Sequence, residues 1–256
     1  MGVFRADRPL AGHFFTLVDH PCSDQNLSAQ DYLKYTRHSA FSSGERQGHV
    51  CISVGDISYR FGGEEKPLRL KIVQAGEPVL RQAAQPLTPD QIVKDDVQRL
   101  ILDMRETMRD APGVGLAAPQ VGISIQLAVI EDQEESLKNV PAQELEQKER
   151  RPVAFHVLIN PRIVQTGDEK AKFFEGCLSL SGFSAIVERS RTVRVEYLNE
   201  RGESRSVDAS GWYARILQHE IDHLHGTLYI DRMHSRTFTS MDNWNRFRRS
   251  NPVPRG

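Results

Sequence analysis

The chain has few cysteines, no long apolar run and almost no net charge, and each absence excludes a class of protein. Its 256 residues include only three cysteines, an odd and sparse set that indicates a reducing compartment rather than a disulfide framework. No apolar run approaches the roughly 20 residues that span a bilayer. The formal net charge of −1 gives no field of one sign that would attract nucleic acid or a membrane surface. We therefore expect no membrane partner and no specific nucleic-acid sequence as a partner.

The first residues also lack the features of a targeting segment. They contain no apolar core of the kind found in secretory signals, and Asp7, Asp19 and Asp24 interrupt what would otherwise be a basic organellar presequence. We predict a cytoplasmic protein; an organellar location is disfavoured but stays open.

The composition, 39% hydrophobic and 26% charged, is that of a globular protein. We expect three segments along the chain. Residues 1–66 form an N-terminal extension of unknown role, which leads into a Gly-rich linker. Residues 67–240 form the main domain, and residues 241–256 form a basic C-terminal tail.

Helix signals occur at two places in the main domain. Thr88-Pro89-Asp90-Gln91 has the form of a helix start, and apolar residues then recur every three or four positions, which predicts an amphipathic helix of about 20 residues. A second helical pattern starts after a capping Ser210 and ends at Gly226. Alternating apolar residues predict strands at 68–73, 123–130, 155–160, 163–165, 171–174, 192–198 and 204–207. The predicted fold class is α+β, with antiparallel or mixed sheets packed around the later helix and an amphipathic helix near the N-terminal end of the domain.

The later helix carries a His-Glu-x-x-His pattern at His219, Glu220 and His223. Positions i and i+4 of a helix share one face, so both imidazoles can reach one metal ion. Glu220 would sit beside the ion and could move a proton to and from a bound water. The pattern is short, and a surface helix rich in His and Glu would also show it.

A third ligand is needed, and the chain does not supply the usual one downstream. No Glu follows Glu220, and the spacing His-x-x-Gly-x-x-His is absent. Upstream, Cys177 lies between two predicted strands in the segment Glu-Gly-Cys-Leu-Ser. A lone cysteine is often an inert buried thiol. Beside an incomplete two-His site, however, its thiolate would complete a Cys-His-His set with a fourth position left for water.

The segment 113–120, Gly-Val-Gly-Leu-Ala-Ala-Pro-Gln, has almost no side-chain bulk. Such a segment lets another backbone approach closely, although it also suits a tight turn packed in the core. No Gly-Lys-Ser or Gly-Lys-Thr follows, which argues against a phosphate loop.

Three blocks, 113–120, 175–179 and 218–224, resemble in this order the three signature motifs of the peptide deformylase family. The resemblance extends over roughly residues 68–231, so that 67–240 would be the catalytic domain, and residues 1–66 have no counterpart in it. It implies hydrolysis of the formyl group from N-formylmethionine of newly synthesised polypeptides by a hydroxide held on the metal. The implied partners are therefore N-formylmethionyl nascent peptides and, less directly, the ribosome.

The resemblance also assigns roles to individual residues. Cys177, His219 and His223 would hold the metal, and Glu220 would be the general acid and base. Gln120 and the backbone N–H of Leu178 would form the oxyanion hole. The backbone of Val114 and Gly115 would pair with the peptide as an added strand.

Two further sets of residues are assigned from their position. Trp212 and Ile216 share the helix face of the ligands, so we expect them to line the methionine pocket. Arg189 is expected to pair with Glu175 or Asp222 as support for the ligands, unless it is a plain surface arginine.

The expected cofactor is one divalent metal ion. A Cys-His-His set suits zinc, but members of the resembled family often work with ferrous iron. The prediction is Fe²⁺, with Zn²⁺, Ni²⁺ or Co²⁺ as alternatives, because ligand identity alone does not decide between these ions.

Two other functions stay open at this point. A metallopeptidase that cuts internal peptide bonds would need a third ligand after His223, and Asp242 has the only suitable spacing. A non-catalytic member that binds nascent chains or ribosomes could use the arginines of the tail against RNA phosphates, although such residues are usually only solvated. The presence of Glu220 and Gln120 argues against a loss of catalysis.

Overall fold

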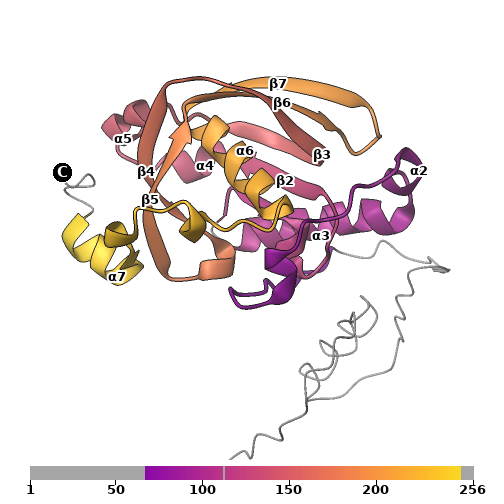
Figure 1. Ribbon diagram of the computed structural model, residues 1–256, viewed down its shortest axis with the longest axis horizontal. Helices are drawn as coiled ribbons and strands as arrows, with labels where there is room; N and C mark the ends of the chain where they lie inside the picture. Colours follow the sequence, from indigo (N-terminus) through magenta and orange to yellow (C-terminus); the bar gives the residue numbers. More distant parts are fainter. Residues whose placement is uncertain (1–66, 112, 249–256) are drawn as a thin grey trace, which may run out of the picture. The chain divides into compact units, whose positions relative to one another are not determined.

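A computed structural model describes residues 67–111 and 113–248. The predicted extension 1–66 and the last residues of the predicted tail lie outside these ranges. Two antiparallel sheets and one central helix organise the described residues (Figure 1). The helices are α2 (Pro89–Ile92), α3 (Asp95–Asp110), α4 (Glu134–Leu137), α5 (Ala142–Gln147), α6 (Gly211–Leu224) and α7 (Met241–Asn243), with short 3-10 helices and a π-helical turn between or after them.

The larger sheet has the strand order β1-β2-β3-β6-β7, and the smaller has the order β4-β5-β8. Every pairing between these strands is antiparallel. The strands are β1 (Gly115–Ala117), β2 (Leu127–Asp132), β3 (Val153–Thr166), β4 (Lys170–Gly176), β5 (Phe183–Ser190), β6 (Thr192–Leu198), β7 (Ser204–Ser210) and β8 (Thr239–Ser240). The predicted mixed α and β class with antiparallel sheets is confirmed. β1 and β4 are both edge strands, so each has one main-chain edge without a partner strand within its sheet.

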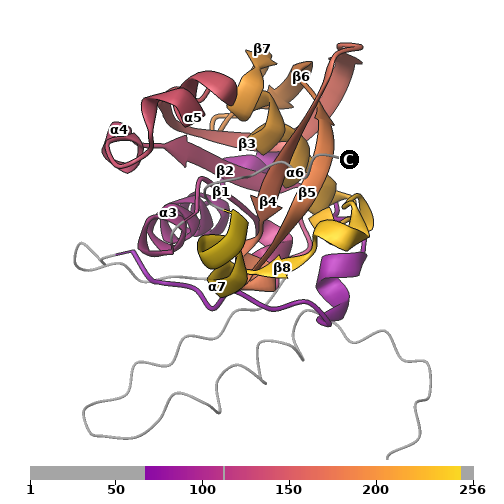
Figure 2. The ribbon, with the colours of Figure 1, turned by 90° about the vertical axis from the view of Figure 1, so that its left-hand side faces the viewer.

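Helix α6 packs against strands of both sheets, and Figures 1 and 2 draw it between them. Its buried face belongs to a core cluster with residues of β1, β2, β3, β6 and β7. Ser210 is its N-cap residue, without a side-chain capping bond. Gly226 follows its end with φ of 72°, a left-handed conformation that favours glycine.

The helix predicted to start at Thr88 is two helices. Thr88 and Gln91 form the expected capping box of α2. The chain then leaves the helical path at Val93 and Lys94, and α3 starts at Asp95. Val93 is 59% exposed rather than part of the core. The apolar spacing runs on through the break because residues on both sides of it pack in the same core cluster.

The predicted strand at 68–73 is wrong, since this segment pairs with no strand. Its amides donate instead to other groups: Leu68 N to Asp103 Oδ1 (2.7 Å), Leu70 N to Thr107 Oγ1 (2.8 Å) and Val73 N to Gln120 O (2.9 Å). Hydrogen bonding to side chains of α3 therefore replaces a strand ladder.

Two strand predictions are also corrected. The segments 155–160 and 163–165 belong to one strand, β3, whose register shifts where Asn160 takes a positive φ of 49° before Pro161. Strand β5 was not predicted, although it pairs with β4 along its whole length. Within the described residues, no helix is both long enough and apolar enough to cross a membrane.

Candidate metal centre

The two histidines of α6 lie on one face of the helix, with ring centroids 4.9 Å apart. His219 Nδ1 is 3.1 Å from Glu175 Oε2, so the other nitrogen of the ring, Nε2, is the one available to a metal ion. His223 is buried, and its Nε2 lies 3.2 Å from Cys177 Sγ. The helix therefore presents two imidazole nitrogens toward the same point.

Cys177 reaches that point from the smaller sheet. It follows directly after β4, where the chain turns into the 3-10 helix Leu178–Leu180. One ligand atom from each of Cys177, His219 and His223 lies within 4.8 Å of the other two. Donors so spaced, one sulfur and two imidazole nitrogens, fit the ligand distances of a divalent transition metal.

Glu220 is buried beside these ligands, and its Oε2 has no hydrogen-bond partner among residues 67–111 and 113–248. Burial raises the pKa of Glu220 to about 7, although the neighbouring His219 acts in the opposite direction. Gly115 of β1 lies directly against it, because an added Cβ at this position would overlap the carboxylate. Among the described residues, a buried carboxylate with one unpartnered oxygen thus lies next to three metal-type donors.

Gln120 also lies next to the thiol and belongs to the 3-10 helix Ala118–Val121. Its Oε1 accepts from Ala117 N (2.9 Å), and its Nε2 lies 3.4 Å from Cys177 Sγ and 3.3 Å from Ser179 Oγ. Leu178 follows Cys177, and its side chain packs against Gly113. The predicted oxyanion groups and the glycine segment are thus brought to the same place as the ligands.

The sequence and fold of this chain match known proteins over most of its length. The family model described as polypeptide deformylase matches residues 69–238. Peptide deformylase 1A, chloroplastic, of Solanum lycopersicum is 47% identical over 182 residues, which are 71% of this chain and 66% of that protein. Peptide deformylase 1 of Bifidobacterium longum is 45% identical over 75% of this chain and 85% of its own length. A crystal structure of class I type b peptide deformylase from Acinetobacter baumannii with bound Met-Ala-Ser has a TM-score of 0.58 and 32% identity, over 65% of this chain and 99% of that one.

The chain belongs to the peptide deformylase family. Membership confirms the predicted family and the predicted enzyme activity, removal of the N-formyl group from newly synthesised polypeptides. It also supports a divalent metal ion as the cofactor. Neither alternative function, the metallopeptidase or the non-catalytic binder, is favoured.

The two predicted pocket residues differ in their surroundings. Ile216 is buried in the core cluster of α6, against which Val114 also packs. Trp212 lies seven residues before His219, about 10 Å along the helix axis. Lys148 Nζ lies 4.7 Å and Arg150 Cζ 5.6 Å from the centre of its ring, and both side chains come from the region of α5. Trp212 also packs against the core cluster that contains Ile216, so the predicted pocket role of both residues stays a prediction.

A buried charge network surrounds the deformylase ligands. Arg189 donates to both oxygens of Glu175 (3.0 and 2.9 Å) and to Asp222 Oδ2 (2.5 Å), so both partners expected for it are present. Burial alone would raise the pKa of Glu175, but its hydrogen bonds to His219 and Arg189 outweigh burial and hold that pKa well below its usual range. An ionised Glu175 accepts from His219 Nδ1 and so fixes which ring nitrogen faces the ligand point.

Sequence reasoning missed two members of this neighbourhood. Ser179, fully buried, donates its amide to Cys177 Sγ (3.4 Å) and holds the amide of Gln120 through its hydroxyl. Arg215 donates to Glu175 Oε1 (2.5 Å) from the helix itself. The sequence did contain an indication that Arg215 is buried near the ligands, because this arginine stands between apolar residues one helical turn before His219.

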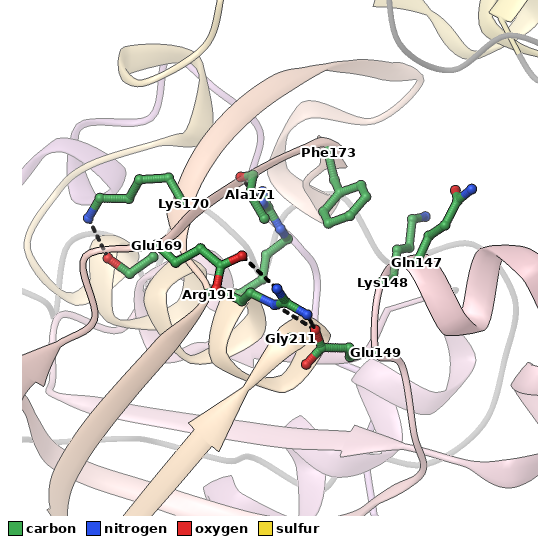
Figure 3. A pocket seen from close by; sticks show the side chains of 11 residues that line it. Gln147, Lys148, Glu149, Glu169, Lys170, Ala171, Phe173, Arg191 and Gly211 are labelled. Carbon is green, nitrogen blue, oxygen red and sulfur yellow. Dashed lines mark hydrogen bonds and ion pairs between the residues drawn. The ribbon is translucent and has the colours of Figure 1, made fainter.

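A cavity of about 170 Å³ lies beside this network, between the end of α5, the start of β4 and the start of α6 (Figure 3). Arg191 bridges Glu149 and Glu169 across it, and Lys170 donates to Ser190 Oγ. Arg215 is also part of its lining. The other basic side chains of its lining also have partners, because Lys148 pairs with Glu144 and Arg215 with Glu175.

Proposed function

We propose that Cys177, His219 and His223 hold the divalent ion and that Glu220 carries the proton of the deformylation reaction. The observation that carries this proposal is the convergence of three ligand atoms from two separate elements within 4.8 Å of one another. When bound, the ion supplies a Lewis acid that makes a nucleophile of water near neutral pH.

In this proposal Glu220 accepts the proton of the attacking water and donates it to the amine that leaves with the peptide. Its unpartnered Oε2 supports the role, since the atom is free to take up a hydrogen bond when substrate and water arrive. Gly115 supports it too, because any larger residue there would displace the carboxylate.

The formyl oxygen gains negative charge during attack. We assign its stabilisation to Gln120 Nε2 and the backbone N–H of Leu178. The position of Nε2, 3.4 Å from Cys177 Sγ, supports this assignment, and Oε1 is anchored to Ala117 N so that the amide cannot turn freely. Removal of one such donor typically costs about 2.7–4 kcal/mol of transition-state stabilisation.

The peptide itself is proposed to bind as an added strand along Val114 and Gly115. The free outer edge of β1 supports this mode, since main-chain groups there have no partner strand. Ile216 and Trp212 are assigned to the methionine pocket, and their packing in one core cluster with Val114 supports this assignment.

The test is release of formate from formyl-Met-Ala-Ser by protein purified under reducing, anaerobic conditions. Glu220→Ala should keep one metal ion per chain and lose activity, whereas Cys177→Ser should lose stoichiometric metal. Full metal retention by Cys177→Ser would contradict the ligand assignment. Metal analysis of the same preparation tests the proposed Fe²⁺, which rests on the family resemblance, against Zn²⁺, Ni²⁺ and Co²⁺.

Three further proposals concern the domain bounds, the cellular location and the C-terminal tail. We propose 67–240 as the catalytic domain, which the family match over 69–238 supports, with a 1–66 extension and a 241–256 tail. A cytoplasmic location is proposed from the sequence; relatives include a chloroplastic and a human mitochondrial enzyme, so fractionation of the source cells is the test. Docking of the tail on ribosomes is tested by co-sedimentation before and after its removal.

A further inference from the structure

The ligand set is assembled from two elements that could move separately. A helix fixes the separation of His219 and His223, because both belong to α6. Cys177 comes instead from the β4–β5 hairpin of the smaller sheet. The distance from its sulfur to the two imidazoles therefore depends on whatever fixes this hairpin on the helix.

Arg215 makes that connection from α6. It is 3% exposed, and its guanidinium forms three hydrogen bonds to the hairpin. Nη1 donates to Glu175 Oε1 (2.5 Å) and to Val187 O (3.0 Å), and Nη2 donates to Ala171 O (2.6 Å). The face of the same guanidinium lies 5.3 Å from the ring centre of Phe173.

These contacts reach both strands of the hairpin. Ala171 and Glu175 belong to β4, and Val187 belongs to β5, where it pairs with Phe173. Arg215 itself stands four residues, or one helical turn, before His219. Glu175 stands two residues before Cys177 and accepts from His219 Nδ1. One side chain of the helix thus holds the strand that carries the thiol and the carboxylate that orients the first imidazole.

A second arginine acts from the other side. Arg189 belongs to β5 and donates to Asp222 of α6, three residues after His219. The hairpin is therefore tied to the helix both before and after the first histidine ligand. Arg232, in contrast, contacts Asp222 alone in this network, and it is half exposed.

We propose that Arg215 is a positioning residue that fixes the β4–β5 hairpin on α6 and so sets the distance from Cys177 Sγ to the two imidazole nitrogens. This inference rests on the proposed metal-binding role of Cys177, His219 and His223. It requires the forked shape of the guanidinium as well as its charge, because two backbone carbonyls and a carboxylate must be reached at once.

The shape requirement separates this role from a purely electrostatic one. Arg215→Lys keeps the charge, but a single ammonium cannot span acceptors on both strands. Arg232→Met is the matched control, since it removes one positive charge from the same network without touching the hairpin.

The experiment measures Co²⁺ binding by competition with a chelator, together with the thiolate-to-cobalt charge-transfer band, below the melting temperature of every variant. We expect Arg215→Lys and Arg215→Met to weaken Co²⁺ binding tenfold or more, in the range typical for groups that orient metal ligands, and to weaken or shift the band. Arg232→Met should stay within about twofold of the unsubstituted protein, as a surface charge would.

Arg215→Lys, which keeps volume and charge, is the deciding variant where Arg215→Met does not fold. Unchanged Co²⁺ affinity and an unchanged band in Arg215→Lys would overturn the inference. An equal loss in Arg232→Met would overturn it as well, because charge alone would then explain the effect. Failure of the unsubstituted protein to bind one Co²⁺ would instead contradict the proposed function.

Discussion

Single residues in the site are constrained by contact as much as by chemistry. Gly115 shows this most directly, because its backbone rests on the carboxylate of Glu220. The sequence indicated a need for close backbone approach in this segment. It could not say that the approaching group is the proposed proton carrier, since that contact joins residues more than a hundred positions apart.

We predict that Gly115→Ala lowers kcat for formyl-Met-Ala-Ser at least tenfold while the protein keeps its metal. The added methyl group would overlap Glu220 Oε1 and force the carboxylate away from its position, and small displacements of this kind are costly to catalysis. Steady-state formate release and metal content per chain are the measurements. Unchanged kcat with full metal content would show that Glu220 tolerates the displacement.

The residues of the candidate site could be predicted from sequence where they belong to short motifs. His219, Glu220, His223 and Cys177 stand in segments whose residue types have few other uses together. Arg215 and Ser179 show the limit. Their roles depend on which distant strand or insertion packs against α6, and periodicity along one element does not contain that information.

Among the helices, α3 contributes residues spaced three or four apart to a core cluster that it shares with β1, β2 and β3. Met104 is fully buried at the centre of this face, whereas Leu102 on the same helix is 39% exposed. We predict that Met104→Ala lowers the free energy of unfolding by about 2–5 kcal/mol, because a cavity remains where the side chain packed.

Leu102→Ala should change stability by less than about 0.5 kcal/mol beyond its helix propensity. Denaturant unfolding measures both variants. Similar losses in the two would mean that the buried face of α3 has been misassigned.

A charge pair joins α3 to β2. Arg109 donates two hydrogen bonds to Glu131, each 2.7 Å long. The hydrogen bond from Arg109 lowers the pKa of Glu131, although partial burial acts against it. A carboxyl whose pKa is lower in the folded chain adds stability above its ordinary pKa of 4.5, and that contribution is lost as the pH falls through the lower folded value.

We therefore predict that Glu131→Gln lowers the free energy of unfolding at pH 7 by up to about 1 kcal/mol, since the pair is partly exposed to water. The difference from the unsubstituted protein should shrink steadily as the pH is lowered from 4.5 through the lower pKa of Glu131 in the folded chain. Urea unfolding of both proteins across this range is the measurement. A difference that does not depend on pH would assign the effect to packing instead of charge.

The strands and helices were predicted well where one face alternates cleanly, as in β6 and β7. They were predicted poorly where tertiary contacts replace the local pattern. The segment 68–73 alternates like a strand, yet its amides bond to side chains of α3. Strand β5 was missed because its buried face includes the charged residue Arg189. A pattern of alternating apolar and polar residues assigns such a charge to a solvent-exposed position.

For the chain as a whole, the question is how much is needed to build the enzyme. The segment after residue 66 is tied into the site: Val73 N donates to Gln120 O (2.9 Å), and Ala75 N donates to Ser179 O (2.8 Å). These two bonds join the start of the proposed domain to two residues that contact Cys177 Sγ.

We predict that a chain starting at residue 67 releases formate with unchanged kcat/KM, since 65% of the sequence already covers 99% of the Acinetobacter baumannii structure. A chain starting at residue 76 should lose most of its activity, because the anchors of Gln120 and Ser179 are gone. Activity and thermal unfolding of the two truncated proteins are the measurements. Loss of activity in the longer protein would assign a catalytic need to the extension.

The unpaired outer edge of β1 has a consequence for the range of proteins that one such enzyme can serve. A main-chain edge pairs with amide groups that are the same in every polypeptide, whatever gene encodes it. In the proposed binding mode, selectivity then falls on the initiator residue and its formyl cap alone. A single enzyme of this design can therefore process start sites across an entire proteome without a dedicated recognition sequence in any of them.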